Sequence, residues 1–455
     1  MSIETRLVER VLARRDQTPS VRAREAARIF LLDTLGVALC GSRVPLLETL
    51  SQTSLRWGSG EEARIWGSGR RVPATTAAFL NAWQIHNQEY DCVHEGAVVH
   101  PMAVVASTLL AWCEANAVVP GDRLLRAVCI SVDVAAAIGM AARNGLRFFR
   151  PAMGGALGAT AGLASLARLD AAATHSALGI TYSQLSGTMQ AHVEGSPVLP
   201  MQIGFNARAV LTSIELARAG IRGPHDFLTG PFGYFRLMDT DWDERELAAR
   251  VEQDDHVAEL SHKPFPTGRA AHGGVDGLLE LKAKHGFDAA DVVAVLVKAP
   301  PLVIQLVDRP ALPDMPASYA RLCLPYIAAT ALLRGSVDVE DFDSTALRET
   351  ARFELAARVR MQLDDNPSRN TLAPQCVSVE LRGGARHEIA LPAVLGNPAR
   401  PLSARQREAK FARCCRAAAR PLDDARIAAL SAAVHDLEHL PDARSLIDLL
   451  VTAAP

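Results

Sequence analysis

Residues 75–115 read TTAAFLNAWQIHNQEYDCVHEGAVVHPMAVVASTLLAWCEA, with a polar segment between two apolar ones. The first apolar segment covers residues 75–86, and the second begins at Pro101 and ends at Ala115. Apolar segments of this length, without alternation of polar residues, indicate helices that are buried on all sides. Proline is favoured at the first position of a helix, so Pro101 marks a helix start. The stretch therefore predicts two buried helices joined by a polar loop.

Helical patterns continue on both sides of this stretch, as far as about residue 240. Apolar positions recur at helical spacing in residues 22–40, and this segment ends at Gly41. Further helices are expected at residues 127–143, 154–169, 170–189 and 207–219. In the segment 154–169 small residues recur every three or four positions, which permits close helix–helix approach; they are Gly154, Gly155, Gly158, Ala159 and Gly162.

The pattern changes near residue 240, where charged and proline-containing segments follow. Strands are expected at residues 291–298 and 376–391, the second broken by Gly383-Gly384 as a hairpin turn would be. Between them, residues 319–333 and 347–363 are expected to form helices, and the chain is helical again from Ser403. The sequence predicts a mostly α fold. A large helical domain (1–262, completed by 395–455) would carry a smaller α+β lid domain (263–394).

Composition excludes several classes of protein. The chain has 455 residues, a net charge of −2 and eight cysteines, none of them in a CxxC pair. Its arginines are dispersed among acids, without the basic stripe of nucleic-acid binders. The start is charged and lacks the apolar core of a signal peptide, and apolar stretches such as 102–112 are too short to span a membrane. We expect a cytoplasmic protein that binds neither nucleic acid nor membranes.

The polar segment between the two buried helices is the strongest candidate site. It holds three acids and three imidazoles within fifteen residues: His86, Glu89, Asp91, His94, Glu95 and His100. Such a cluster is typical of acid–base catalysis in a cleft. Two alternatives remain open. The segment could bind a metal, although its spacing matches no recognised chelating pattern, or it could be a polar loop that caps helices.

The chain resembles the MmgE/PrpD family, which includes 2-methylcitrate dehydratases. The resemblance runs from about residue 20 to 415 in the family's order. Five segments carry it: LLDTLGVALCG (31–41), NAWQIHNQEYDCVHEGAVVHP (81–101), AGIRGPHDFLTGPFGYF (219–235), SHKPFPTGRAAHGGVDG (261–277) and LCLPYIAATALLRG (322–335). The resemblance implies a helical domain with an α+β lid, paired as a homodimer. It also implies reactions next to a carboxylate, with no metal or organic cofactor: dehydration of 2-methylcitrate, decarboxylation of cis-aconitate or epimerisation of iminodisuccinate.

The resemblance also assigns roles to individual residues. Glu89 and Asp91 fall on the first and second acids of the family's D-F-D-D-T-H motif, His94 on its histidine, and His100 on the histidine of the HP pair. We expect His100 to act as acid or base and Asp91 as its partner. Positively charged side chains would bind substrate carboxylates, and Tyr326, on the family's LPY tyrosine, would donate a hydrogen bond or proton. The implied binding residues are Lys263, Arg269 and His272, all in the K-x-Y-P block.

The sequence also departs from the family's pattern. A histidine is absent near Phe149 and a lysine near Leu199. We expect Arg150 to replace the lost cation, because a guanidinium binds carboxylate bidentately. Gln190, with His192 and Glu194, would refill the cleft. These changes favour an acid other than 2-methylcitrate, with fewer carboxylates.

The sequence therefore predicts a cofactor-independent hydro-lyase for a small polycarboxylate. An isomerase, an epimerase or a decarboxylase on the same scaffold, or an inactive binding protein, remain the alternatives.

Overall fold

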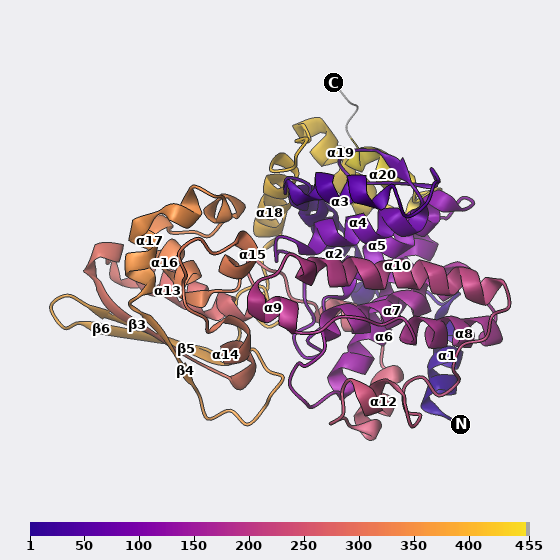
Figure 1. Ribbon diagram of the computed structural model, residues 1–455, viewed down its shortest axis with the longest axis horizontal. Coiled ribbons are helices and arrows are strands. Elements are labelled where there is room, and N and C mark those ends of the chain that lie inside the picture. Colours follow the sequence, from indigo (N-terminus) through magenta and orange to yellow (C-terminus); the bar gives the residue numbers. More distant parts are fainter. Residues whose placement is uncertain (452–455) are drawn as a thin grey trace.

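The computed structural model describes residues 1–451 and shows a mostly α-helical protein with two lobes (Figure 1). The large lobe contains the helices up to α12 and the last three helices of the chain. The small lobe contains the elements from α13 to β6. The two apolar segments, residues 75–86 and 101–115, form helices of the large lobe, as the sequence predicts.

Buried apolar helices make up the centre of the large lobe. The helix α4 packs against α2, α5 and α10, which explains why it is apolar on every face. The helices and the small ladder of this lobe are α1 (Ile3–Arg14), α2 (Val21–Gly41), α3 (Leu46–Ser54), β1 (Ala63–Arg64), β2 (Arg71–Val72), α4 (Ala74–His86), α5 (Pro101–Ala115), α6 (Gly121–Ala141), α7 (Arg150–Leu166), α8 (Ala171–Tyr182), α9 (Gln190–Glu194), α10 (Val198–Arg218), α11 (Tyr234–Leu237), α12 (Glu244–Val251), α18 (Ala404–Arg416), α19 (Asp424–His435) and α20 (Ser445–Leu450).

The glycines of α7 allow this helix to lie directly against α6. A Cβ atom at Gly158 would be 2.2 Å from the backbone oxygen of Ser131, and one at Gly162 would be 1.9 Å from its Oγ. No side chain larger than a hydrogen atom fits at either position. The prediction that small residues permit close helix approach here is confirmed.

A four-stranded sheet in the order β4-β3-β5-β6 is the frame of the small lobe. Strand β3 pairs parallel to β4 and antiparallel to β5, with Val295 opposite Val359 and Val379. Helix α13 packs on β5 and β6. The elements of this lobe are α13 (His272–His285), β3 (Val292–Ala299), α14 (Pro301–Val307), α15 (Ala317–Ala320), α16 (Leu324–Arg334), α17 (Thr350–Ala356), β4 (Val359–Leu363), β5 (Gln375–Leu381) and β6 (Arg386–Leu391).

Two predictions for this lobe have different outcomes. The hairpin is confirmed: β5 and β6 flank Gly383 and Gly384, whose φ angles of +91° and +85° favour glycine. The single helix predicted over residues 347–363 is wrong. Helix α17 ends at Ala356 and the chain continues as strand β4, because residues 359–363 pair with β3.

Helix α6 is long and apolar enough to cross a membrane by length and composition. However, 89% of its apolar window is buried inside the protein. A core helix of a globular protein has the same property, so α6 gives only weak evidence for a membrane span.

Candidate active site

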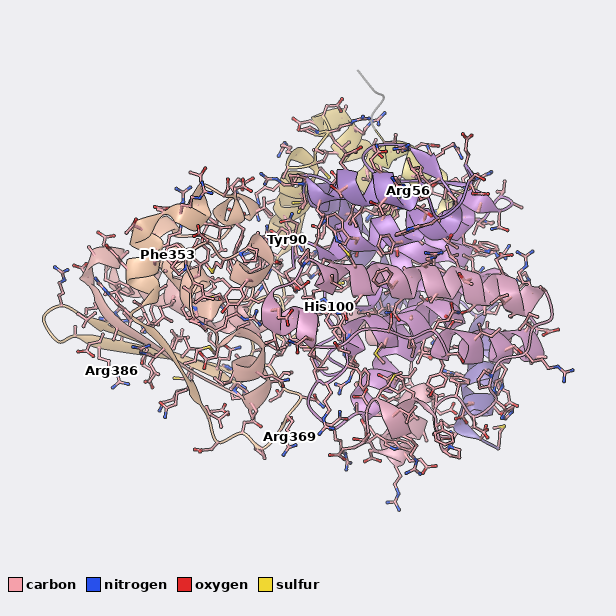
Figure 2. All side chains as sticks on the ribbon, viewed as in Figure 1. Arg56, Tyr90, His100, Phe353, Arg369 and Arg386 are labelled. Atoms are coloured by element: carbon pink, nitrogen blue, oxygen red, sulfur yellow. The ribbon has the colours of Figure 1, made fainter. Side chains whose placement is uncertain are left out.

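The polar loop between α4 and α5 lies where the two lobes meet, and Figure 2 labels His100 and Tyr90 in this region. His100 is the N-cap of α5 and Pro101 its first residue. Backbone bonds between Val93 and Ser261, of 3.1 and 2.8 Å, tie the loop to the segment that leads into the small lobe. Glu89 has a φ angle of +51°, a strained conformation for a residue with a side chain. Strain of this kind is common where a backbone must aim functional groups.

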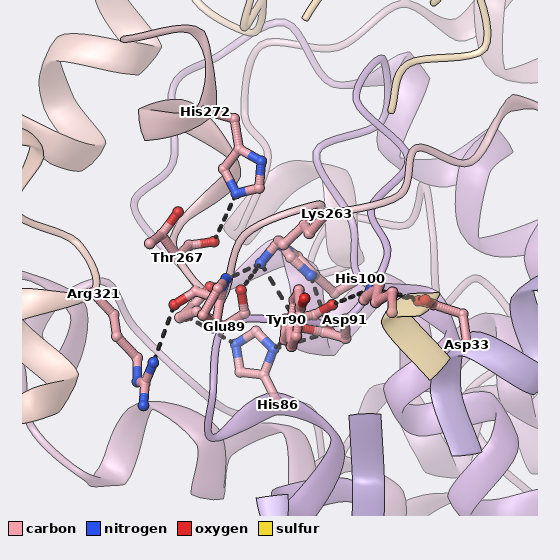
Figure 3. A network of polar contacts seen from close by, with 12 residues as sticks. Asp33, His86, Glu89, Tyr90, Asp91, His100, Lys263, Thr267, His272 and Arg321 are labelled. Carbon is pink, nitrogen blue, oxygen red and sulfur yellow. Dashed lines mark hydrogen bonds and ion pairs between the residues drawn. The ribbon is translucent and has the colours of Figure 1, made fainter. Parts of the chain in front are cut away.

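Asp91 is the centre of the cluster and is fully buried. Its carboxylate accepts hydrogen bonds from Nδ1 of two imidazoles: His86, at 3.0 and 3.1 Å, and His100, at 3.1 Å. The ammonium group of Lys263 lies 3.8 Å from its Oδ1. Figure 3 shows these side chains pointing toward one another, from α4, the loop, the start of α5 and the segment after residue 260.

Lys263 is fully buried and its main partner is Glu89. The ammonium group donates to the backbone oxygen of Glu89 at 3.1 Å and to its Oε2 at 3.0 Å. Burial alone would raise the pKa of Glu89, but Lys263 and the nearby imidazoles of His86 and His100 lower it to about 2. The carboxylate of Glu89 therefore stays ionised at neutral pH.

The two imidazoles that share Asp91 differ in their protonation. Burial alone would lower the pKa of His86, but the carboxylates of Asp91 and Glu89 outweigh burial and raise it. Burial also lowers the pKa of His100; here Asp91 offsets it only partly, and the pKa stays below its usual value. Burial would raise the pKa of Asp91 as well, but its cationic neighbours hold it well below its usual range. The arrangement therefore places an imidazole of raised pKa beside one of lowered pKa, which is what paired acid and base chemistry needs.

A cavity of about 60 Å³ lies between the lobes, and both imidazoles line it together with Glu89. The Nε2 atom of His86 is buried and lacks a hydrogen-bond partner among the described residues; its nearest acidic atom is Oε1 of Glu89, at 3.5 Å. The other residues that line the cavity come from both lobes and are mostly apolar: Val93, Val98, Leu146, Phe149, Pro151, Met189, His192, Gly268, Arg269, Ala270, Leu306, Val307, Leu322 and Leu372.

Two groups of side chains in the described part of the chain have the geometry for a metal ion. In the first, His86, Asp91 and His100, a divalent cation would face the ammonium group of Lys263, which is unfavourable. In the second, Nδ1 of His94 accepts the backbone N–H of Ala97 at 3.1 Å. The proton of a neutral His94 is then on Nε2, the atom that would have to bind the metal.

The structure brings together four of the residues expected from the sequence: Glu89, Asp91, His100 and Lys263. It does not bring His94 to the cavity. Nε2 of His94 instead donates to Glu259 at 3.1 Å, and Glu259 also accepts from His256 at 2.9 Å.

The two arginines expected to bind substrate already have protein partners. Arg269 lines the cavity, but its Nε and Nη2 donate to Glu95. Its remaining donors face backbone oxygens of His262, Leu395 and Val394. Arg150 is buried and bonded to Asp239 at 2.8 to 3.2 Å, because its position at the first turn of α7 faces the loop after α11.

Three other expected site residues are also engaged elsewhere. The hydroxyl of Tyr326 donates to the backbone oxygen of Asp341 at 2.7 Å, in the core of the small lobe. Nε2 of His272 faces the backbone oxygen of Thr267 at 3.3 Å, so this histidine braces the start of α13. Gln190 is exposed and donates to Glu194. None of the three lines the cavity.

Of the cavity histidines, His86 was given no role from the sequence, whereas His192 was expected to help refill the cleft. His86 was recognised as part of the polar segment but given no role, although its place one helical turn before Glu89 was a usable signal. His192 was considered only as a replacement for the absent lysine. It reaches the cavity because α9 projects toward the small lobe (Figure 1), which no local pattern reveals.

Comparison with known proteins gives consistent matches along the chain. The MmgE/PrpD N-terminal domain matches residues 6–246 and the MmgE/PrpD C-terminal domain matches residues 265–436. The chain is 28% identical to a cis-aconitate decarboxylase of Mus musculus, over 92% of this chain and 88% of that protein. It is 27% identical to the Homo sapiens cis-aconitate decarboxylase, over 95% and 91%. A cis-aconitate decarboxylase-like protein of Aspergillus oryzae is 26% identical, over 94% and 92%.

The interval between the two matched domains, residues 247–264, coincides with the passage of the chain from the large lobe toward the small one. The acids and histidines of residues 86–100 lie in the first domain, and Lys263 lies in this interval. With both domains matched in order over most of its length, the chain belongs to the MmgE/PrpD family and is a lyase of that family.

Proposed function

We propose that this lyase acts on a small polycarboxylate by moving a proton at a carbon next to a carboxylate, without a metal or an organic cofactor. The observation that carries the proposal is the His100 imidazole, which Asp91 orients at the wall of a cavity between the lobes. The names of the relatives support the substrate class, since they are cis-aconitate decarboxylases.

His100 is the proposed base and proton carrier. Its Nδ1–H donates to Asp91, so the lone pair of its Nε2 is available on the cavity side. Because its pKa is lowered, the imidazole is free to accept a proton at neutral pH. Asp91 stabilises the imidazolium that forms, as a carboxylate does in other His–Asp pairs.

His86 is the proposed acid or electrostatic partner. Its pKa is raised, and its buried Nε2 lacks a hydrogen-bond partner among the described residues, with Oε1 of Glu89 3.5 Å away. A protonated Nε2 donates to a substrate carboxylate or to charge that develops beside it. The two imidazoles and Lys263 keep Asp91 ionised, and Lys263 is itself held by Glu89.

Among lyase reactions, we propose decarboxylation first. The bond between the carbon skeleton and one carboxylate breaks, CO₂ leaves, and the electron pair remains on the skeleton, where an imidazolium delivers a proton. The apolar cavity wall supports this choice, because a carboxylate loses charge as CO₂ departs. Dehydration, expected from the sequence, is the second candidate. In that reaction His100 takes a proton from carbon while His86 protonates the leaving hydroxyl.

Assays with cis-aconitate and with hydroxy-polycarboxylates in D₂O distinguish these reactions. Decarboxylation releases CO₂ and incorporates deuterium; dehydration gives an alkene absorbance without CO₂. If neither product forms and no deuterium enters any acid of the panel, the proposed function is wrong. Activity should survive dialysis against EDTA. A loss that added zinc restores would support a metal site.

We also propose a setting for this activity. The small lobe would open and close as a lid, since side chains from both lobes line the cavity. The protein would work in the cytoplasm as a homodimer.

A further inference from the structure

His192 introduces a hydrogen-bond donor into an otherwise apolar part of the cavity. It lies on α9, is 5% exposed, and lines the cavity with His86 and His100. Nη2 of Arg309 donates to its Nδ1 at 3.1 Å, and Nη1 of Arg309 donates to its backbone oxygen at 2.9 Å. Since an arginine cannot accept a hydrogen bond, the proton of the ring is on Nε2.

Burial, reinforced by Arg309, lowers the pKa of His192 to about 4. The ring is therefore neutral at physiological pH, and its Nε2–H makes no hydrogen bond to a described residue. A neutral donor that is fixed in orientation is suited to a carboxylate oxygen.

Most positively charged side chains around the cavity are already paired with an acid. Few of them are therefore available to bind substrate carboxylates. Arg269 is matched by Glu95, and Lys263 is matched by Glu89. His86 and Asp91 form a further pair. Arg309, which lies directly behind His192, makes no ion pair with a described residue. Its positive charge is therefore not neutralised by a described acid, and it reaches the cavity through the His192 ring.

Apart from Arg269, which is paired with Glu95, the rest of the wall is mainly apolar. The residues beside His192 and opposite His100 are apolar: Leu146, Phe149, Met189, Leu306, Leu322 and Leu372. A carboxylate placed among them would lose its hydration without gaining a cation, which is strongly unfavourable. An alkyl or aryl group of similar size would instead gain from burial.

We propose that His192, held by Arg309, binds one substrate carboxylate, and that the cavity selects a dicarboxylate with an apolar substituent over a tricarboxylate. This inference rests on the proposed function and names its substrate class. The second carboxylate lies at His100, next to the carbon that exchanges a proton. The apolar substituent fills the wall formed by the leucines and Phe149.

The test compares two ligands of nearly equal shape. cis-Aconitate is maleate with a carboxymethyl group, and isobutylmaleate carries an isopropyl group in place of the third carboxylate. Calorimetry on the full-length protein should give at least tenfold tighter binding of isobutylmaleate. Equal or tighter binding of cis-aconitate overturns the inference, as does the absence of binding by either ligand.

Variants of His192 test the carboxylate contact. His192→Phe keeps a ring but removes the donor, and should weaken isobutylmaleate binding at least tenfold. His192→Gln, whose amide can donate, should recover most of the affinity. Val193→Ala, at an exposed neighbouring position of α9, is the matched control and should bind as the wild type does. Unchanged binding by His192→Phe, or equal losses in the Phe and Gln variants at unchanged melting temperature, contradicts the inference.

Failure of the inference can be told apart from failure of the proposed function. If cis-aconitate is turned over and isobutylmaleate does not bind, the substrate class is wrong and the lyase proposal stands. If isobutylmaleate binds tightly and no acid of the panel exchanges deuterium, the binding inference stands and the lyase proposal is wrong.

Discussion

At the scale of single residues, the environment of each imidazole decides its chemistry. His86 and His100 share one carboxylate, yet Glu89 lies 3.5 Å from the second nitrogen of His86 and faces no corresponding atom of His100. Glu89 therefore raises the pKa of His86, whereas Lys263 adds to the effect of burial in lowering that of His100. An enzyme that needs a proton donor and a proton acceptor at one carbon gains both from a single buried aspartate.

Replacing the proposed base should remove activity and preserve the fold. His100→Ala removes the imidazole proposed to accept the proton, so kcat should fall by about 10²–10⁴-fold. The melting temperature should change little, because the ring lies at the cavity wall. His439→Ala, at an exposed histidine, is the control. Wild-type kcat in His100→Ala would exclude this residue as the base.

The pH dependence of kcat/KM should report both imidazoles. The rate should rise with pH as His100 loses its proton, below its usual pKa of 6.5, and fall as His86 loses its proton, above 6.5. Asp91→Asn removes a charge that raises the pKa of both rings. The alkaline limb should therefore move to lower pH in this variant. An alkaline limb that stays in place would show that His86 is not the titrating acid.

The sequence located the centre of the site but not the partners of its charged residues. Asp91, His100, Glu89 and Lys263 were identified because they lie on motif positions. Arg269 and Arg150 were expected to bind substrate, and only the fold reveals the acids Glu95 and Asp239 that engage them. A sequence shows which side chains carry charge. It does not show which charges are already neutralised.

At the scale of elements, local sequence patterns predicted the secondary structure correctly where only one periodicity fitted the residues. The glycine spacing of α7 has a single helical interpretation, and the structure confirms it. Residues 347–363 have two interpretations. Leu355, Val359 and Leu363 recur every four residues, which fits a helix, but residues 359–363 pair with β3 in the sheet. Parallel pairing across more than sixty residues depends on tertiary contacts that local periodicity does not contain.

The helix α18 returns from the end of the chain to support the active-site loop. Lys410 is buried and contacts Asp33 of α2 at 2.8 Å. It also donates to the backbone oxygen of Tyr90 at 3.0 Å, one residue before Asp91. The last helices therefore position the catalytic loop, although they contribute no residue to the cavity.

Removing this lysine should destabilise the protein strongly. Lys410→Met leaves Asp33 as a buried charge without a partner, at a cost of about 3–5 kcal/mol in the free energy of unfolding. Burial already raises the pKa of Asp33, and protonation would relieve the buried charge. The loss should therefore shrink as the pH falls. Urea unfolding measures it, and the double variant Asp33→Asn/Lys410→Met should lose less. Equal losses at all pH values would contradict this account.

At the scale of the whole molecule, the catalytic groups belong mainly to the large lobe, and the small lobe closes the apolar side of the cavity. This division has a physical basis. Proton transfer needs groups held rigidly, and the buried helices α4 and α5 hold them. The small lobe, proposed above to act as a lid, is attached through the segments near residues 263 and 394. The sequence predicted this two-part organisation from a change in composition, but it could not place α9 and Arg309 on opposite sides of the junction.

The outer face of α10 is the surface on which a homodimer should form. This long helix crosses the surface of the large lobe (Figure 1), and it exposes Val198, Phe205 and Leu216, with Trp57 beside them. Exposed apolar stripes of this kind commonly mark protein–protein contacts.

Light scattering should give twice the 48.7 kDa mass of one chain, and Phe205→Glu should halve the mass. Val118→Glu, at an exposed residue away from the stripe, is the control. A wild-type mass of one chain would exclude the dimer, and a dimer that survives Phe205→Glu would place the interface elsewhere.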